Sequence, residues 1–267
     1  IRWKQLKEVS RVPKLSIITV TFNSEAYLEE TLQSVLQQNY EDYEYIVIDG
    51  KSEDQTIDIV RRYLQPFAGR LRYISESDQG IYDAMNKGIE MATGEYIGMI
   101  NSDDKYTPDA FLKVAECIEN GHSDVIYSDL NLIDLDGKKI GCLFGDASKL
   151  NRGMTVNHPT CFVKREVYQK FGTYDLQYSI VADYDFILKI YNKGATFFKA
   201  STSLADFRVG GTSSNNYRSV IEKYNVQRKY YSVWPCLYVW VRGVVRCKLL
   251  EPIRNRAFRI NSIGRGN

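Results

Sequence analysis

The sequence predicts an α/β fold built on a doubly wound, mostly parallel sheet, and two observations support this class. Segments typical of strands and helices alternate four times within the first ~105 residues, which favours a parallel sheet with right-handed crossovers. The strand segments are runs of β-branched and apolar residues, the pattern of strands buried in a parallel sheet. With 267 residues, 44% of them hydrophobic, the chain can bury a full core.

The elements of the first half follow in a regular order. Strands are expected at residues 15–21, 43–49, 71–75 and 95–100. Helices are expected between them, at residues 24 to about 36, about 54 to 64 and about 81 to 91. Ser24 is a suitable N-cap for the first helix, in which Leu28, Leu32 and Leu36 share one face. Each strand–helix pair therefore predicts one β–α unit of the sheet.

Beyond about residue 125 the regular alternation stops. Short strands are expected at residues 125–127, 196–199 and 204–208, and a hairpin at 131–141 with Asp136 and Gly137 in its turn. Helices are expected at residues 183–192 and 215–231, and residues 234–250 are apolar with interspersed Arg and Lys. Residues 145–157 have few apolar side chains, which predicts a mobile loop without regular structure.

The net charge of +2 conceals an uneven distribution along the chain. From Arg228 onward there are nine Lys or Arg and one acid, Glu251, a net charge of 9 − 1 = +8. The preceding residues carry 26 Lys or Arg and 32 Asp or Glu, a net charge of −6. A basic tail on an acidic body predicts contact with an anionic partner, either a membrane surface or a nucleic acid.

The cysteines and histidines indicate neither disulfides nor a zinc site. Five cysteines are widely spaced without a CxxC pair, and His122 and His158 are the two histidines. This usage predicts a reducing compartment. The opening residues lack the apolar core of a signal peptide, and no window holds about 18 uncharged apolar residues, so a soluble body is expected.

Acidic residues follow three strands of the predicted sheet. Asp49 ends the second strand, Asp78 follows the third, and Asp103 and Asp104 follow the fourth. The carboxyl ends of parallel strands share one edge of an open sheet, where ligands bind. Adjacent carboxylates are costly to desolvate, but they suit Mg²⁺ or Mn²⁺, which are often shared with substrate phosphates. The acids therefore predict a nucleotide and a divalent metal here, although each could instead cap a helix.

Two common nucleotide-binding motifs are absent from the sequence. No G-x-G-x-x-G follows the first strand, which ends with residues 21–24 (TFNS), so a dinucleotide fingerprint is excluded. No G-x-x-x-x-G-K-[ST] occurs either, which excludes P-loop phosphate transfer. What remains is a nucleotide site built around the acids at the strand ends.

Seven short segments form an ordered pattern. They are residues 19–23 (TVTFN), 49–56 (DGKSEDQT), 75–88 (SESDQGIYDAMNKG), 101–104 (NSDD), 158–160 (HPT), 182–185 (ADYD) and 207–214 (FRVGGTSS). Together they resemble family 2 glycosyltransferases of GT-A fold, most closely the bacterial branch that builds O-antigen and capsule repeats. The resemblance covers about residues 13 to 215. It divides the chain into a nucleotide-sugar half (13–124), an acceptor half (125–215) and a basic amphipathic helical tail (216–267).

The resemblance implies a donor site at the strand ends. It places Thr21 and Phe22 beside the base, Asp49 in a hydrogen bond with the uracil ring and Asp78 near the nucleoside. The full set of residues expected to bind the nucleotide sugar is Thr21, Phe22, Asn23, Asp49, Asp78, Asn86, Lys87, Asn101, Ser102 and His158. Two of these residues have alternative roles without a ligand, since Lys87 could be a solvated lysine and His158 a structural histidine.

The resemblance also implies a metal site and a general base. The segment Asn101-Ser102-Asp103 stands in place of the D-x-D metal motif, and Asp103 and Asp104 are the expected ligands of Mn²⁺ or Mg²⁺. Asp183 stands where the family keeps its base, and its alternative role is that of a helix N-cap.

Three positions depart from the family pattern. Asn101 replaces the first Asp of D-x-D, and Met85 stands where an Arg often precedes the helix Asn. The late histidine that completes the metal shell in some relatives has no counterpart near Arg208.

The expected activity is that of an inverting, metal-dependent glycosyltransferase of the hexosyltransferase type. It would use a UDP-sugar and a saccharide acceptor linked to polyprenyl diphosphate, in assembly of a surface polysaccharide. Two alternatives stay open: a nucleotidyltransferase that makes NDP-sugars, and a UDP-sugar-binding subunit without catalysis.

The basic tail is expected to contact a membrane and not a nucleic acid. Apolar and aromatic side chains of residues 234–250 alternate with cations, a pattern that fits a helix lying on anionic lipid. No nucleic-acid recognition motif accompanies the positive charge. The expected location is therefore cytoplasmic and peripheral, on the inner face of the cell membrane.

Overall fold

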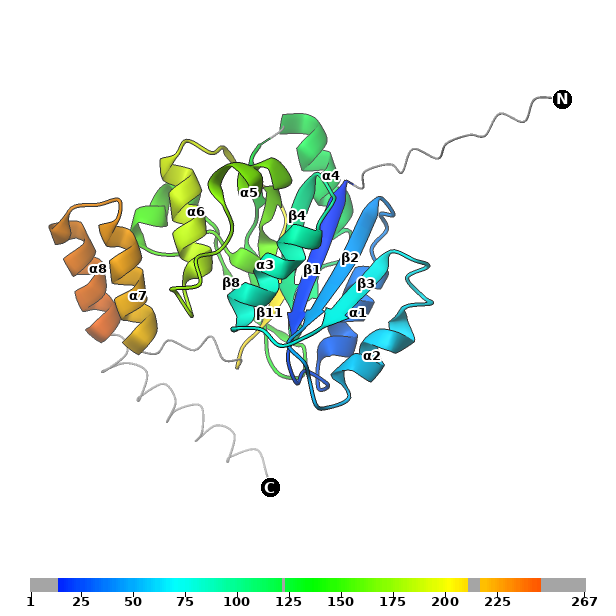
Figure 1. Cartoon of the computed structure of the whole chain (residues 1–267). Helices are drawn as coiled ribbons and strands as arrows, with labels where there is room; N and C mark the ends of the chain where they lie inside the picture. The colour runs from blue at the N-terminus through cyan, green and yellow to red at the C-terminus, as the bar shows by residue number, and fades with distance from the viewer. Residues whose placement is uncertain (1–13, 122, 211–216, 246–267) are drawn as a thin grey trace, which may run out of the picture.

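The computed structural model describes residues 14–121, 123–210 and 217–245. Its centre is a seven-stranded sheet in the order β10-β6-β9-β4-β1-β2-β3 (Figure 1). The strands are β1 Leu15–Thr21, β2 Tyr43–Asp49, β3 Leu71–Ser75, β4 Tyr96–Asn101, β6 Val125–Tyr127, β9 Phe162–Lys164 and β10 Phe197–Lys199. The neighbours from β4 to β3 pair in parallel, and β9 is antiparallel to both β4 and β6. The predicted mostly parallel sheet is confirmed.

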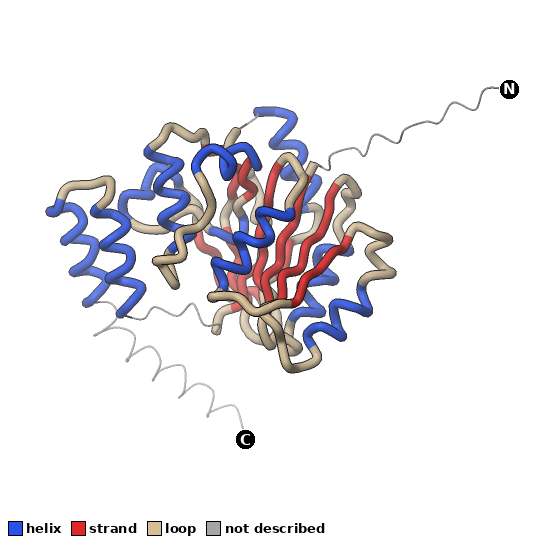
Figure 2. The backbone as a smooth tube through the Cα atoms, viewed as in Figure 1, coloured by secondary structure: helices blue, strands red, loops and turns tan. Residues whose placement is uncertain are grey.

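Helices cover both faces of this sheet (Figure 2). They are α1 Leu28–Leu36, α2 Thr56–Tyr63, α3 Ile81–Met91, α4 Ala110–Gly121, α5 Arg165–Phe171, α6 Ala182–Asn192, α7 Tyr217–Arg228 and α8 Val233–Val245. Apolar side chains of α1, α2 and α4 pack on one face, against Leu15 and Ile17 of β1. Those of α3, α5 and α6 pack on the other, against Ile18 and Val20. The alternation of side chains along a strand therefore supplies two cores from one buried run.

A smaller sheet lies beyond the end of β4. It has the order β5-β11-β7-β8, formed by Lys105–Tyr106, Ala205–Arg208, Leu130–Ile133 and Lys139–Leu143. The predicted hairpin is the β7–β8 pair, and Gly137 takes a positive φ of 79° in its turn. Because β5 follows β4 almost directly and pairs with β11, this sheet is anchored at the edge where the strands of the large sheet end.

Two local expectations are wrong. Residues 145–157 are not structureless, because Ala147–Arg152 form a 3₁₀ helix, and Leu150 and Val156 are fully buried. These anchors are too few and too irregularly spaced to produce a periodic pattern. Helix α1 begins at Leu28, not at Ser24, because residues 24–27 form a turn in which the hydroxyl of Ser24 donates to Phe22 O.

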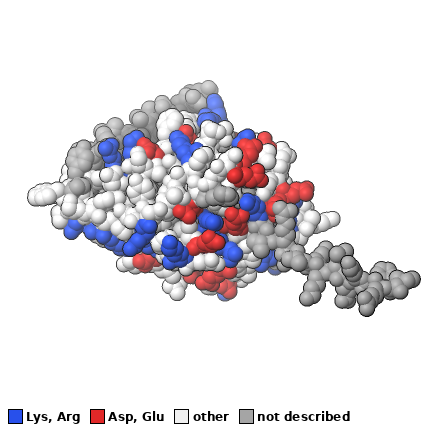
Figure 3. Space-filling model, turned by 90° about the horizontal axis from the view of Figure 1, so that it is seen from above, with Lys and Arg blue, Asp and Glu red and all other residues white. Residues whose placement is uncertain are grey.

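The helices α7 and α8 form a hairpin beside α6 (Figure 1). Trp234 of α8 is 79% exposed, and Val233 and Val241 are also exposed. Over the residues that the structure describes, no helix is both long and apolar enough to cross a bilayer. The last part of the predicted basic tail, residues 246–267, lies outside the described residues. On the face seen in Figure 3, acidic and basic side chains are interspersed, and neither sign covers it alone.

Candidate functional site

The ends of β1, β2 and β3 bring their last residues side by side at one edge of the sheet. Thr21 is in register with Asp49, and Asp49 is in register with Ser75. The loops that follow these strands therefore meet at one place, as the parallel order predicted.

An exposed aromatic ring and a carboxylate face each other across Gly50. A Cβ at Gly50 would lie 2.6 Å from Asp78 Oδ2 and 3.3 Å from a ring carbon of Phe22. Phe22 is 61% exposed, and Asp78 is half-buried with its Oδ1 accepting from Gly80 N at 2.8 Å. An aromatic face beside a hydrogen-bond acceptor can stack a nucleobase and accept from its N–H or from a ribose hydroxyl.

Asp49 is engaged by its own neighbours. It is fully buried, and its carboxylate accepts from Ser52 N at 3.0 Å, from the Ser52 hydroxyl and from the Ser75 hydroxyl at 2.6 Å. The adjacent Thr21 Oγ1 is buried without a hydrogen-bond partner. Asn23 links the same loops, because its N–H donates to Ser52 Oγ and its Oδ1 accepts from Glu53 N. Within the protein, Asp49 therefore holds the loop after β2 in place.

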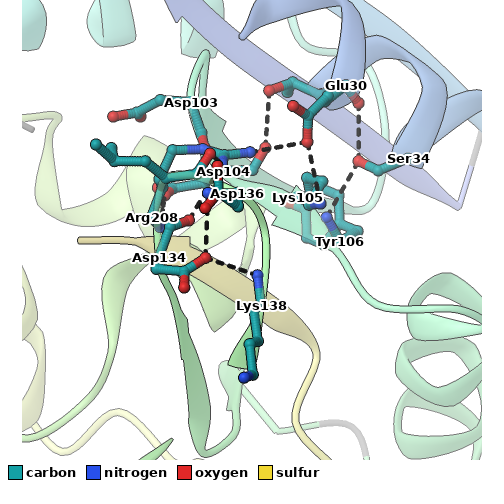
Figure 4. A network of polar contacts seen from close by, with 12 residues as sticks. Glu30, Ser34, Asp103, Asp104, Lys105, Tyr106, Asp134, Asp136, Lys138 and Arg208 are labelled. Atoms are coloured by element: carbon teal, nitrogen blue, oxygen red, sulfur yellow. Dashed lines mark hydrogen bonds and ion pairs between the residues drawn. The ribbon is translucent and has the colours of Figure 1, made fainter. Parts of the chain in front are cut away.

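The end of β4 forms a turn that carries the predicted metal motif. Asp104 N donates to Asn101 O, and Ser102 Oγ donates to Ser24 Oγ at 2.8 Å. Asp103 is half-buried, and burial raises the pKa of its carboxyl group. Figure 4 shows this carboxylate pointing away from the guanidinium group of Arg208. The carboxylate of Asp103 therefore lies at the end of β4, outside the contacts of Arg208.

Asp104 and Arg208 belong to a buried network instead (Figure 4). Asp104 is fully buried, its Oδ1 accepts from Arg208 N at 2.9 Å, and its Oδ2 has no hydrogen-bond partner. Burial raises the pKa of the Asp104 carboxyl group well above its usual range, and the neighbouring Asp103 carboxylate adds to this effect. Asp104 is therefore placed to join β11 to the end of β4.

The guanidinium group of Arg208 ties four segments together. It is 2% exposed, it pairs with Glu30 at 2.8 Å, and it lies over the ring of Tyr27 at 4.2 Å. It also donates to the main-chain oxygens of Asp103, Asp134 and Leu135. The smaller sheet is thereby fastened to α1 and to the strand-end turn.

No set of three or more His, Cys, Asp or Glu side chains lies close enough to hold a metal ion within residues 14–121, 123–210 and 217–245. Asp103 is one carboxylate at the strand end, whereas Asp104 already holds Arg208. One carboxylate suits a cation that takes its remaining ligands from water and substrate phosphates, as Mg²⁺ usually does. The residues fit a metal shared with a diphosphate better than a closed protein site.

A cavity of about 370 Å³ lies between α3, α6 and the smaller sheet. It joins three predicted site residues from distant segments, Asn101, His158 and Asp183. Much of the remaining wall is apolar and includes Ile81, Met85, Leu130, Leu143, Met154 and Phe207. The cavity therefore connects the end of β4 with the predicted base.

Asp183 lies in the first turn of α6, two residues after the N-cap Val181, and its carboxylate accepts from one of the first-turn N–H groups. Its Oδ1 accepts from the hydroxyl of Tyr82 at 3.0 Å and from Tyr184 N at 2.8 Å. With Oδ1 held by two donors, the other oxygen is the one available to take a proton in the cavity. The arrangement suits a general base.

His158 begins a short 3₁₀ helix at the cavity wall. Its Nε2 lies 3.0 Å from the hydroxyl of Tyr174, and burial lowers the pKa of its ring, while the Asp183 carboxylate partly opposes that shift. A neutral imidazole in this place can offer one donor or one acceptor to a substrate.

The structure gives Asn86 and Lys87 partners within the protein. The amide of Asn86 both donates to Tyr174 O and accepts from Tyr174 N, each at 2.9 Å. Lys87 donates to Ser77 O and pairs with Glu76 at 2.8 Å. Asn86 therefore links α3 to the segment before α6, and Lys87 supports the loop that carries Asp78.

Sequence reasoning missed two residues that shape the site. Tyr82 stands inside the quoted 75–88 segment, but tyrosines are common in cores and nothing marked this one. Arg208 entered the sequence analysis only because no histidine stands near it, and its strand, ADFR, also holds Asp206, so the sequence offers no clear signal that this arginine is buried.

Comparisons with known proteins agree on one family. The sequence pattern described as Glycosyl transferase family 2 matches residues 16–172. A PGL/p-HBAD biosynthesis glycosyltransferase of Mycobacterium bovis is 33% identical over 185 residues, covering 68% of this chain and 72% of that protein. An uncharacterized glycosyltransferase of Haemophilus influenzae is 26% identical over 222 residues, covering 82% of this chain and 89% of that protein.

Solved structures share the fold. The S. aureus TarS 1-349 structure in complex with UDP-GlcNAc has a TM-score of 0.66 and 21% identity, covering 87% of this chain and 72% of that chain. The mannosyltransferase PcManGT from Pyrobaculum calidifontis, in complex with GDP-Man and Mn²⁺, has a TM-score of 0.65 and 16% identity, covering 97% and 77%. The GT-A type of the fold is confirmed.

Proposed function

The chain belongs to glycosyl transferase family 2, and on this premise we propose that it transfers a sugar from a UDP-sugar to a hydroxyl group of a saccharide acceptor, inverting the anomeric carbon. One observation carries the proposal. Asn101, at the end of β4, and Asp183 line the same cavity. A donor held at the strand ends and an acceptor in the second half would meet there.

The chemistry follows from the side chains that meet in the cavity. Asp183 takes the proton of the acceptor hydroxyl group, while the oxygen of that hydroxyl group attacks the anomeric carbon of the donor sugar. The bond from that carbon to the diphosphate oxygen breaks, and the electron pair leaves with the nucleoside diphosphate. Attack from the side opposite the leaving group inverts the configuration in a single displacement.

The donor lies along the ends of β1 to β4 in this proposal. Phe22 stacks the uracil ring, Asp78 accepts from the nucleoside, and Gly50 leaves room for both. Asp103 is the protein ligand of Mn²⁺ or Mg²⁺, which neutralises charge on the diphosphate when bound. Asp104 contributes by holding Arg208 behind this turn.

The acceptor lies against the smaller sheet, and we propose that it is a lipid-linked saccharide, as in assembly of O-antigen or capsule. The apolar side chains of Leu130, Leu143 and Phe207 form a wall for its less polar part. Exposed Trp234 and Val241 on α8 support contact with anionic lipid at the cytoplasmic face of the membrane.

The test is a panel of UDP- and GDP-sugars with and without Mn²⁺. Thermal stabilisation by UDP-sugars that depends on metal, together with slow donor hydrolysis, is the expected result. Donor binding without hydrolysis or transfer to any saccharide acceptor would favour the non-catalytic alternative. A protein that binds no nucleoside diphosphate contradicts the proposal.

A further inference from the structure

We infer that the carboxylate of Asp183 is positioned from two sides, by Tyr82 of α3 and by Glu222 of α7. Tyr82 holds the side chain directly, and Glu222 holds the main chain just before it. The inference rests on the proposed function, since that function makes Asp183 the base. Both residues are positioning residues, because neither touches the reacting atoms.

Tyr82 makes two close contacts with the segment that carries the base. Its hydroxyl lies 3.0 Å from Asp183 Oδ1 and 2.8 Å from Ile180 O. The side chain is buried, and its ring packs on that of Tyr174 with centroids 5.5 Å apart. Burial, strengthened by the nearby Asp183 carboxylate, raises the pKa of Tyr82 far above its usual value. The hydroxyl therefore keeps its single proton, and Asp183 Oδ1 and Ile180 O share it as acceptors.

Glu222 holds the same segment from the other side. Its carboxylate accepts from Ile180 N at 3.0 Å and from Ser179 Oγ at 3.0 Å, and Arg218 donates to it at 3.0 Å. Burial alone would raise the pKa of Glu222, but these hydrogen bonds lower it below its usual value, so the carboxylate is ionised near neutral pH. Ile180 is thus fixed at its N–H by Glu222 and at its carbonyl by Tyr82.

The contacts of α7 continue on the other side of Asp183. Gln227 Nε2 donates to the hydroxyl of Tyr184 at 3.1 Å, and Lys229 pairs with Asp185 at 2.8 Å. Side chains of α7, and of Lys229 directly after it, therefore hold residues on both sides of the proposed base, at 179–180 and at 184–185. This helix lies beyond residue 172, where the family match ends, and by these contacts it supports the segment that forms the wall of the site.

Tyr82→Phe tests the direct contact, because it removes the hydroxyl and keeps the ring. We expect kcat to fall roughly tenfold to a hundredfold, the range for losing a hydrogen bond to a charged group, with the donor KM unchanged. In an Asp183→Asn background the same change should cost almost nothing further, because its effect passes through that carboxylate. Tyr168→Phe is the matched control, since its buried hydroxyl contacts Tyr174 at 3.4 Å and should keep wild-type kcat.

Glu222 variants test the second side without altering the cavity wall. Glu222→Ala removes every acceptor for Ser179 and Ile180, and we expect kcat to fall roughly tenfold at unchanged donor KM. Glu222→Gln retains one acceptor oxygen and should recover most of that loss. UDP binding and the midpoint of thermal unfolding are measured for each variant, so that a folding defect is recognised.

The outcomes separate this inference from the function on which it rests. If Tyr82→Phe lowers kcat equally with and without Asp183, or if Glu222→Gln is as slow as Glu222→Ala, the positioning roles are overturned and Asp183 can still be the base. If Asp183→Asn turns over at the wild-type rate, the proposed base and its positioning both fail.

Discussion

The strand ends proposed to bind the donor (the donor edge) and the cavity wall that carries the proposed base, Asp183 (the base wall), are held in place in different ways. At the donor edge, the ends of β1, β2 and β3 are neighbours in register, so strand pairing alone brings Thr21, Asp49 and Ser75 together. At the base wall, Asp183 is set by a hydroxyl 101 residues away in sequence and by a helix hairpin that follows it. The donor edge is thus part of the sheet, whereas the base wall depends on how α7 packs against the segment around Asp183.

This difference predicts that the two regions fail separately. Changes at the strand ends should weaken donor binding, whereas changes around α6 and α7 should slow turnover and leave binding intact. A third position, Arg208, joins the smaller sheet to the strand ends and should affect the whole fold.

The largest effect is expected at Asp183, the proposed base. Asp183→Asn should reduce the rate of transfer by roughly 10²- to 10⁴-fold, the range for losing a general base, while UDP affinity stays within about twofold. Single-turnover kinetics and calorimetric titration with UDP measure the two quantities. Transfer at a near wild-type rate would mean that another residue is the base, and a large loss of UDP affinity would erase the contrast between the two regions.

Arg208→Met should lower the free energy of unfolding by about 3 kcal/mol, because it leaves three main-chain oxygens without their buried donor. Glu30 adds little to this loss, since its side chain is 45% exposed and keeps its pair with Lys105. Urea denaturation measures the loss. Arg61→Met is the control, since its pair with Asp58 is exposed and should be worth less than about 1 kcal/mol. Equal effects of the two substitutions would show that the buried network does not join the sheets energetically.

Asp103→Ala should abolish the metal-dependent part of donor stabilisation. At a ligand concentration about 100 times its Kd, binding stabilises a protein by about 2.7 kcal/mol, and we expect the portion that needs Mn²⁺ to disappear. Thermal unfolding with UDP, with and without Mn²⁺, measures it. Asp58→Ala on α2, at an exposed acid that already pairs with Arg61, should leave the metal response unchanged. A persistent response in Asp103→Ala would place the metal elsewhere.

The smallest effect concerns pH and His158. Burial lowers the pKa of this ring below that of the unfolded chain, about 6.5. As pH falls below 6.5, the unfolded state takes up a proton that the folded state does not, so stability decreases. His158→Gln removes this difference and should flatten the fall in the urea midpoint between pH 7.5 and pH 5.5. If the urea midpoints of the wild type and of His158→Gln fall in parallel with pH, this prediction is wrong.

The strand-end acids show where sequence reasoning reaches its limit. Their convergence followed from parallel order, and the structure confirms that order. The sequence did not predict which of these acids are buried. Asp49 and Asp104 are fully buried and hydrogen-bonded to neighbours, while Asp78 and Asp103 are half-buried at the edge. Which side a carboxylate faces depends on loop conformations that composition does not encode.

By itself the sequence determined the α/β class, the first three β–α units with the fourth strand, and the family, because these depend on local periodicity and on ordered motifs. Tertiary structure alone decided that Arg208 lies in a buried network and that Tyr82 and α7 surround Asp183. These contacts join residues far apart in the chain, and their geometry exists only once the two cores have packed. Local sequence patterns indicate which residues are buried, whereas the residues that each of them contacts depend on how the elements pack in the fold.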